Sequence, residues 1–422
     1  MEHLIRSAES RLARINVPLS LRLPGGRTVG PPRADVTVEF SRWPAVALLA
    51  AGEIGKIAEG FVEDRIRIEG TMRKVMDVAA QLLPASPVPE KIPLWQRAAR
   101  RVRSAAAHSI TRDAAQVQFH YDVSDDFYAL WLDPKRVYSC AYFSQPAMTL
   151  AQAQEAKLDH ICRKLMLRPG ERFLDIGAGW GGLLLWAAEH YGVDATGITL
   201  SKNQHAHVTQ LIRDKGLESR VRMRLCDYRD LAAEQPFDKI ASVGMIEHVG
   251  QANLGAYFGK IFGLLAPGGL VLNHGITAAG PQAGQLGAGI GDFIEKYIFP
   301  GGELLHVSQL LREGAVAGLE MLDTENLRPH YARTLWAWSD GLEGQLGQAL
   351  VALRSNGSTP PAQAERVLRA YRLYLAGSAM SFERGWLSLH QMLAARPAQG
   401  ADFGNPPGAA SRYPFTRKYM YP

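Results

Sequence analysis

The fold of this chain is decided by residues 171–182, which read ERFLDIGAGWGG. A hydrophobic run ends in the carboxylate of Asp175 and passes through Gly177, Gly179 and Gly181 into a helix-like segment. Glycines between a strand and a helix let the backbone approach a ligand, and the helix N-terminus adds a favourable dipole. The order GxGxGG departs from the GxGxxG of dinucleotide sites, and an acid placed first suits a cofactor with a cationic head. The turn therefore favours S-adenosylmethionine over NAD, with a purely structural turn as the alternative.

Strand and helix patterns alternate downstream of this turn. Hydrophobic strand patterns follow at residues 194–200, 220–227, 237–245 and 268–277, and Ser201 is a suitable N-cap for the helix after the first of them. Strands that alternate with helices form a parallel sheet covered on both faces, so the predicted fold class is α/β.

The rest of the C-terminal half interrupts this alternation. The Gly-rich stretch 278–303 indicates a mobile loop. Helical patterns follow between residues 303 and 375, and residues 381–395 predict a late strand.

The first quarter of the chain differs in pattern and in charge. Short strand patterns within residues 16–40 precede helix patterns at 44–62 and 71–83, and the Pro-rich stretch 82–93 predicts a domain boundary. Residues 1–104 hold 17 Lys and Arg against 11 Asp and Glu, whereas the remainder holds 30 of each kind. A basic portion on a neutral body indicates an anionic partner, either nucleic acid or anionic lipid. A solvated surface without function is the alternative.

Basic side chains also follow the Pro-rich stretch, where Trp95 precedes Arg97, Arg100, Arg101 and Arg103. On a helix they form a basic face with an aromatic edge, which suits lipid headgroups. A linker helix that pairs with acids elsewhere explains the same pattern equally well.

Polar side chains stand where the predicted strands end. Thr199, Leu200 and Gln204 follow the second strand, where a typical site places an acid on the ribose. Asp227 and Tyr228 follow the third strand and are positioned for the adenine end of the cofactor.

Glu247 and His274 end the next two strands, over the crevice in which open α/β sheets bind ligands. Taken singly, Glu247 is typical of a helix start and His274 of a satisfied core residue. Their places at adjacent strand ends favour a functional role. Upstream, residues 118–143 contain eight aromatic side chains, which predict either a hydrophobic cap or the lining of an apolar substrate tunnel.

Composition excludes several classes of protein. With 47% hydrophobic residues, 21% charged residues and 3 cysteines, the chain is neither disordered nor fibrous nor a disulfide scaffold. The N-terminus lacks the apolar block of a signal peptide, and no apolar run approaches the ~18 residues of a membrane span. We expect a soluble, cytoplasmic protein, and we predict no metal site.

Seven sequence blocks together resemble the cyclopropane fatty acid synthases and their relatives, the mycolic acid methyltransferases. In chain order they read HYDVSDDFY, VYSCAYF, LDIGAGWGG, GITLSKNQ, MIEHVG, LNHGIT and YLAGSAMSF. Seven blocks in the same order are far more specific than any one of them. The resemblance covers roughly residues 115–395, and residues 1–104 loosely fit the accessory domain of the phospholipid-acting synthases.

The resemblance implies a set of site residues. S-adenosylmethionine would be held by Tyr138, Ser139, the loop from Phe173 to Gly181, residues 199–204, Asp227 and Tyr228. A bicarbonate ion would be held by the backbone near Cys140 and Ile276 and by the side chains of Glu247, His274 and Tyr331. The last block departs from the family, because Ser378 stands where many relatives carry a cysteine. A covalent thiol is therefore not available there, and Cys140 is better interpreted as part of the bicarbonate pocket than as a nucleophile.

The resemblance also implies the architecture: a class I, Rossmann-like methyltransferase domain with a helical insertion, preceded by a small α+β domain. The expected domains are a lipid-engaging unit at 1–92, a basic linker at 93–114, a catalytic domain at 115–395 with its insertion at about 278–375, and a tail at 396–422.

The implied reaction is methylene transfer to the cis double bond of an unsaturated phospholipid acyl chain, at the inner face of the cell membrane. It forms a cyclopropane through a carbocation that bound bicarbonate deprotonates. The sequence leaves two alternatives: an enzyme that forms a methylene- or methyl-branched product, and a lipid-binding protein with an inactive body. The neutral body offers no long phosphate-binding track, so no nucleic-acid partner is expected. Whether the protein forms a homodimer is not decided by the sequence.

Overall fold

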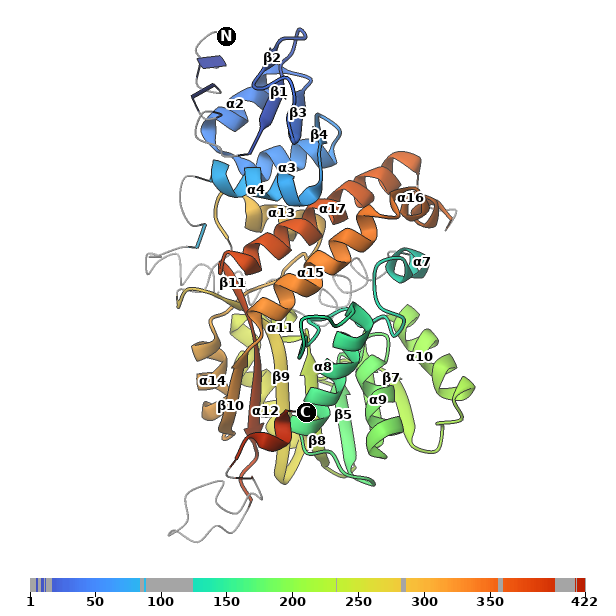
Figure 1. Cartoon of the computed structure of the whole chain (residues 1–422). Coiled ribbons are helices and arrows are strands. Elements are labelled where there is room, and N and C mark those ends of the chain that lie inside the picture. Colours follow the sequence, from blue (N-terminus) through green and yellow to red (C-terminus); the bar gives the residue numbers. More distant parts are fainter. Residues whose placement is uncertain are drawn as a thin grey trace.

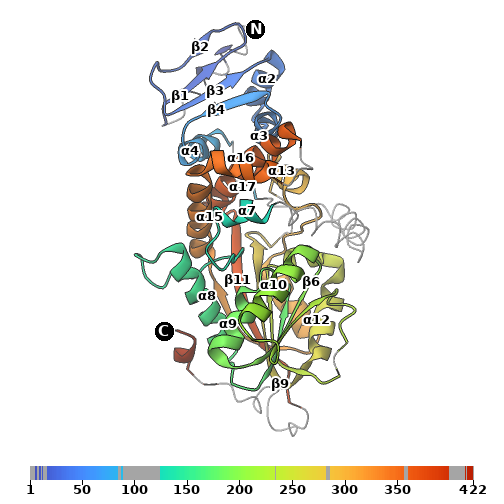
Figure 2. The ribbon, with the colours of Figure 1, turned by 90° about the vertical axis from the view of Figure 1, so that its right-hand side faces the viewer.

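The computed structural model describes residues 5–6, 9–10, 12, 17–83, 87–88, 124–232, 234–281, 286–355, 360–398, 414 and 416–421. A small N-terminal sheet, a layer of helices and a large sheet follow one another along the molecule (Figure 1). Figure 2 shows the same succession from the side. The predicted basic linker at 93–114, which includes Arg97, Arg100, Arg101 and Arg103, lies outside the described residues.

The N-terminal unit contains a four-stranded sheet in the order β2-β1-β3-β4. Its strands are β1 (Leu19–Arg22), β2 (Thr28–Val29), β3 (Val36–Phe40) and β4 (Ile66–Glu69). Its helices are α2 (Trp43–Ala51), α3 (Ile54–Val62) and α4 (Met72–Leu82). The structure confirms the strand and helix patterns predicted within residues 16–83. It adds β4, which the sequence analysis missed because the four residues IRIE carry too short an alternation.

The large sheet has seven strands in the order β10-β11-β9-β8-β5-β6-β7. They are β5 (Arg172–Ile176), β6 (Asp194–Thr199), β7 (Val221–Leu225), β8 (Phe237–Val243), β9 (Leu265–Ala278), β10 (Glu320–Asn326) and β11 (Leu387–Ala395). The late strand predicted within residues 381–395 is confirmed as β11. The parallel sheet predicted from the alternating strands is confirmed for β5 to β9, whereas the later strand β11 runs antiparallel to both β9 and β10.

Helices cover both faces of this sheet, as the alternation predicts. One face carries α8 (Leu150–Lys164), α9 (Gly182–Tyr191) and α10 (Lys202–Asp214); the other carries α12 (Leu254–Leu264) and α14 (Val307–Val316). Fully buried Leu184 and Phe173 belong to the core on the first face, and Ile240 and Tyr257 belong to the core on the second. Ser201 caps α10 as predicted, since its hydroxyl accepts from the Gln204 amide at 3.3 Å.

Between the two sheets lies a layer of helices (Figure 1). It consists of α13 (Ile290–Tyr297), α15 (Arg328–Glu343), α16 (Leu346–Arg354) and α17 (Pro361–Glu383), with the short α7 (Asp125–Ala129) beside it. Two expectations change here. The stretch 278–303 contains helix α13 rather than only a loop, and residues 303–375 contain strand β10 besides helices. Both segments were hard to recognise, because α13 follows glycines and β10 is polar at an edge of the sheet.

The end of the chain returns to the large domain. Residues 416–421 lie against α8, where the buried Met420 carbonyl accepts a hydrogen bond from His160 at 2.9 Å. Among the described residues, no helix combines the length and apolar character that crossing a bilayer requires.

Candidate active site

The glycine-rich turn after β5 has the backbone geometry that only glycine adopts readily. Gly177, Gly179 and Gly181 have φ angles of 78°, 55° and 84°. A Cβ on Gly177 would lie 2.5 Å from Cγ of Met245, whereas the atom nearest to a Cβ on Gly179 would be 4.0 Å away. Gly177 is therefore closed in by packing, and Gly179 faces open space.

A pocket lies over this turn, at the C-terminal ends of β5, β6 and β8. Its lining includes seven of the predicted cofactor residues: Gly177, Gly179, Thr199, Leu200, Gln204, Asp227 and Tyr228. We call it the glycine-turn pocket. Two other predicted residues do not line it, because Asp175 is buried within β5 and Gly181 is the N-cap of α9, packed against Val208.

The polar side chains of the glycine-turn pocket are held by their own neighbours. The Thr199 hydroxyl donates to Gln204 Oε1 at 2.8 Å and accepts from the Ser201 amide at 3.1 Å. The Asp227 carboxylate accepts from the Arg229 guanidinium at 2.8 and 2.7 Å. These bonds fix the side-chain orientations, so the pocket is preformed.

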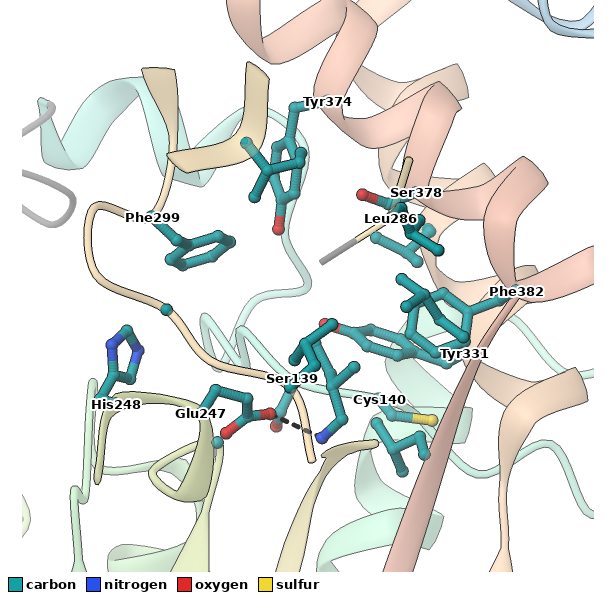
Figure 3. Close-up of a pocket in the computed structure, with 18 of the residues that line it drawn as sticks. Ser139, Cys140, Glu247, His248, Leu286, Phe299, Tyr331, Tyr374, Ser378 and Phe382 are labelled. Carbon is teal, nitrogen blue, oxygen red and sulfur yellow. Dashed lines mark hydrogen bonds between the residues drawn. The ribbon is translucent and has the colours of Figure 1, made fainter. Parts of the chain in front are cut away.

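A second and larger pocket opens beside the first (Figure 3). Its empty volume is about 1140 Å³, including its opening to solvent, and we call it the apolar pocket. Gly244 and His248 line both pockets, which therefore meet at the end of β8. A ligand in the glycine-turn pocket can contact a ligand in the apolar pocket at this point.

Two polar residues of the apolar pocket each have one buried atom without a hydrogen-bond partner among the described residues. These atoms are Glu247 Oε2 and His274 Nε2. Glu247 comes from α11 (Ile246–Val249), and its Oε1 accepts from the Ile276 amide at 2.6 Å (Figure 3). Gln391 Nε2 lies 3.2 Å from His274 Nδ1, and an amide that donates to Nδ1 corresponds to the tautomer with its proton on Nε2. Buried polar atoms are normally satisfied, so this pair indicates a polar ligand.

Burial sets the charge of both groups. It raises the pKa of Glu247 to about 7, because the ionised carboxylate loses its hydration, and the Ile276 amide opposes this only partly. Burial also lowers the pKa of His274 well below its ordinary value, and the nearby cations Lys157 and Lys164 add to the effect. His274 is therefore neutral, and Glu247 changes its charge near neutral pH.

Aromatic rings form much of the remaining wall. Tyr331 from α15 stacks obliquely on Phe382, with ring centroids 4.7 Å apart, and Figure 3 shows its hydroxyl pointing into the pocket on the side of Glu247. The Tyr138 hydroxyl donates to that of Tyr374 at 3.2 Å. Within the described part of the aromatic segment 118–143, Tyr138 lines the pocket, whereas Phe127, Tyr128 and Trp131 pack in the core. The segment thus contributes both to the core and to the wall of the pocket.

Cys140 and Ser378 line the same pocket. Burial raises the pKa of the Cys140 thiol far above its ordinary value, and its Sγ donates to the Ala141 carbonyl at 3.2 Å. A thiol held in this state is a poor nucleophile. Ser378 lies on α17, on the side away from Glu247 (Figure 3).

The three cysteines should differ in reactivity. Cys140 and Cys162 are buried and Cys226 is partly exposed in the glycine-turn pocket, so iodoacetamide should modify Cys226 first in the folded protein. Peptide mass spectrometry after partial labelling measures the order, and labelling in denaturant supplies the control in which all three react. Early modification of Cys140 in the folded protein would contradict its burial.

The structure places Tyr138 and Ser139 in the apolar pocket rather than in the glycine-turn pocket. Ser139 Oγ accepts from Lys157 Nζ at 2.9 Å, and burial of Lys157 lowers its pKa to about 8. Burial likewise raises the pKa of Asp175 to about 7, against the effect of Lys157. The sequence does not predict a buried role for Lys157, because a lysine within a helix usually indicates a solvated face. Gln391, which contacts His274, is easier to recognise as a candidate site residue, because it is an amide within an apolar strand.

Comparison with known proteins identifies the family. The model of the family described as mycolic acid cyclopropane synthetase matches residues 108–392. The chain belongs to this family. A protein of Pseudomonas putida named "Probable fatty acid methyltransferase" is 41% identical over 411 residues, which are 97% of this chain and 98% of that protein.

Two further members have their own names. Cyclopropane mycolic acid synthase 1 of Mycobacterium tuberculosis is 38% identical over 285 residues, covering 66% of this chain and 95% of that protein. A crystal structure of the mycolic acid cyclopropane synthase CmaA1, complexed with SAH and CTAB, is similar with a TM-score of 0.61 at 37% identity. It covers 67% of this chain and 98% of the other.

These similarities confirm the fold predicted from the sequence, a class I, Rossmann-like methyltransferase domain. The chain is an S-adenosylmethionine-dependent methyltransferase of the cyclopropane mycolic acid synthase family, which acts on lipids.

Proposed function

We propose that this enzyme transfers a methylene group from S-adenosylmethionine to the cis double bond of an unsaturated phospholipid acyl chain and forms a cyclopropane. One observation carries the proposal: an apolar pocket with two unsatisfied buried polar atoms, on Glu247 and His274, meets the glycine-turn pocket at Gly244 and His248. An apolar pocket of this size beside the methyl donor suits a hydrocarbon chain as the acceptor.

The glycine-turn pocket fits S-adenosylmethionine. Gly179 leaves open space for a ligand beside the backbone, and Asp227 and Gln204 provide polar groups around it. When bound, the cofactor supplies an electrophilic methyl group on a sulfonium. The chain's own contribution is to aim that end at Gly244 and His248, where the apolar pocket begins.

The polar end of the apolar pocket fits a bicarbonate ion. The Nε2–H of His274 would donate to one oxygen of the ion, and ionised Glu247 Oε2 would accept from its hydroxyl group. Tyr331, which lines the same pocket, would be a further donor. When bound, bicarbonate supplies a small base for the proton that must leave the new methyl group.

The surrounding side chains suit a cationic acyl intermediate. The alkene is a poor nucleophile, so the pocket must exclude water and hold it against the methyl group. The rings of Tyr331, Phe382 and Phe299 line the pocket, and aromatic faces attract a positive charge. Above pH 7 the carboxylate of Glu247 adds a negative charge close by.

A second product is compatible with the same site. If a 1,2-hydride shift first moves the positive charge to the methylated carbon, loss of a proton from the new methyl group gives a methylene branch, and loss of a chain proton gives a methyl-branched alkene. The name of the Pseudomonas putida relative favours keeping this alternative. Both products need the same alkene and the same methyl donor.

The partner that we propose is the phospholipid surface at the inner face of the cell membrane. The basic excess within residues 1–104 supports an anionic surface of this kind. The match to the Pseudomonas putida fatty acid methyltransferase extends over this part of the chain.

The decisive experiment incubates the enzyme with labelled S-adenosylmethionine and vesicles of an oleoyl phospholipid. The expected product is an acyl chain heavier by one CH₂, without vinylic protons and with the high-field protons of a cyclopropane in NMR. Turnover should fall in carbonate-depleted buffer and recover when bicarbonate, but not chloride, is added. Retained vinylic protons would favour the branched product, and no label in the lipid would refute the proposal.

A further inference from the structure

A third cavity lies between the N-terminal unit and the helical layer. Its walls include Ile57 from α3, Val75, Met76 and Ala79 from α4, and residues of α13 and α17. No charged side chain is among its lining residues, and its empty volume is about 830 Å³. We call it the roof cavity, because part of its wall comes from α3 and α4 of the N-terminal unit, which lies over the helical layer (Figure 1).

The roof cavity adjoins the apolar pocket. Six residues line both: Leu286, Ile290, Ile294, Tyr374, Ser378 and Leu387. Figure 3 shows three of them, Leu286, Tyr374 and Ser378, on the side of the pocket away from Glu247. Together the two adjoining cavities extend from the reacting end at Glu247 past α17 to α4, and an acyl chain that passes between the shared side chains would reach both.

The N-terminal unit is firmly placed over this path. The Gly55 amide donates to the Ala288 carbonyl at 2.9 Å, and a Cβ at Gly55 would lie 2.2 Å from the Gly289 carbonyl oxygen. Arg369 of α17 donates to the Val62 carbonyl at 3.0 Å, and Arg73 of α4 pairs with Asp340 of α15 at 2.6 Å. Backbone contacts and ion pairs thus fix the position of the N-terminal unit on the catalytic domain.

We infer that the roof cavity binds the methyl-terminal end of the acyl chain, so that the N-terminal unit limits the chain length accepted. The inference rests on the proposed function. A charged headgroup would lose its hydration in a cavity without charged or paired groups, whereas a hydrocarbon end gains by burial there. The acidic lining residues Glu247 and Glu295 belong to the apolar pocket and not to the roof cavity.

The comparison with relatives is consistent with a determinant of acyl-chain length that lies outside the catalytic domain. The family match begins at residue 108, so the walls from α3 and α4 lie outside the part shared with the mycolic acid synthases. The 97% coverage in the Pseudomonas putida relative includes them. The roof is thus an addition to the family's catalytic domain.

The test is an Ala79→Phe variant, because Ala79 lines the roof cavity and not the apolar pocket. Vesicles carry myristoleoyl, palmitoleoyl or oleoyl chains, which share the carboxyl side of the double bond and lengthen on the methyl side. Overfilling the cavity should lower turnover on oleoyl chains about tenfold relative to myristoleoyl chains. Palmitoleoyl and vaccenoyl chains share their methyl side and should be affected equally. A carboxyl-side effect would separate these two instead and overturn the inference.

Two further variants complete the experiment. Gln81→Phe places the same ring on an exposed position of α4 and should leave the chain-length profile unchanged. Ile57→Ala enlarges the cavity and should raise the relative rate on gadoleoyl chains, so it tests the inference even if Ala79→Phe does not fold. If both cavity variants keep the chain-length profile of the wild type, the inference is refuted and the proposed function is not. If the unmodified enzyme labels no acyl chain, the proposed function is refuted.

Discussion

Glu247→Gln should lower turnover on unsaturated phospholipid by roughly 10²–10⁴-fold, the range typical of losing acid–base function. The amide keeps an oxygen for the Ile276 amide, which Glu247 Oε1 accepts at 2.6 Å, so the local fold should survive. Its second group is an NH₂, which donates and cannot accept from the hydroxyl of bicarbonate. Steady-state rates with labelled S-adenosylmethionine measure the effect, and calorimetry should show cofactor affinity within a factor of about 3 of wild type.

The pH dependence separates this role from a structural one. Since the pKa of Glu247 is about 7, wild-type turnover at fixed bicarbonate concentration should rise with pH through that value. The Gln variant should lack this rise. The free energy of unfolding of the wild type should fall over the pH range in which turnover rises. The Glu247 carboxyl contributes fully to stability below pH 4.5, and this contribution is lost as the pH rises to about 7.

The stability difference provides the control. Above pH 7 the wild type keeps a buried carboxylate, whereas the variant does not, so Glu247→Gln should melt at a higher temperature than wild type at pH 8 and show less advantage at pH 5. A rise of the pKa from 4.5 to about 7 corresponds to a free energy on the order of 3 kcal/mol. Wild-type turnover together with a wild-type melting profile would show that Glu247 has no special role.

The sequence predicts the sheet of the catalytic domain well, because buried parallel strands carry continuous hydrophobic runs that helices separate. It misses β4 and β10, whose residues IRIE and EMLDTEN alternate or are largely polar, as half-buried or edge strands allow. It cannot give the antiparallel direction of β11, since that depends on the path of α17 back to the sheet. Local pattern therefore predicts the elements, and long-range packing decides how they join.

The same division holds for the site. The rule that ligands bind at strand ends places Glu247 and His274 in one crevice, and the structure brings both into one pocket. An amide in an apolar strand singles out Gln391, but no local signal predicts that His274 is its partner, because the two are 117 residues apart. The roof cavity could not be predicted from the sequence either, because its walls come from α4 and α17, which are far apart in the chain.

Gly179→Val should weaken cofactor binding strongly while the protein stays folded. A Cβ at this position meets no protein atom closer than 4.0 Å, so the added side chain projects into the glycine-turn pocket, where a ligand would approach. Steric overlap of this kind costs about 1–3 kcal/mol, which lowers affinity by roughly 10- to 100-fold. Calorimetry with S-adenosylmethionine and with S-adenosylhomocysteine measures the loss directly, without any acyl substrate.

The backbone strain needs its own control, because valine at a φ of 55° is unfavourable wherever it stands. Gly216 has a φ of 63°, no atom within 4 Å of the position that a Cβ would take, and no place in either pocket. Gly216→Val should therefore lose a similar amount of thermal stability and keep its cofactor affinity. Equal affinities in the two variants would show that the cofactor does not approach the turn at Gly179, and the glycine-turn pocket would then have to be assigned to something else.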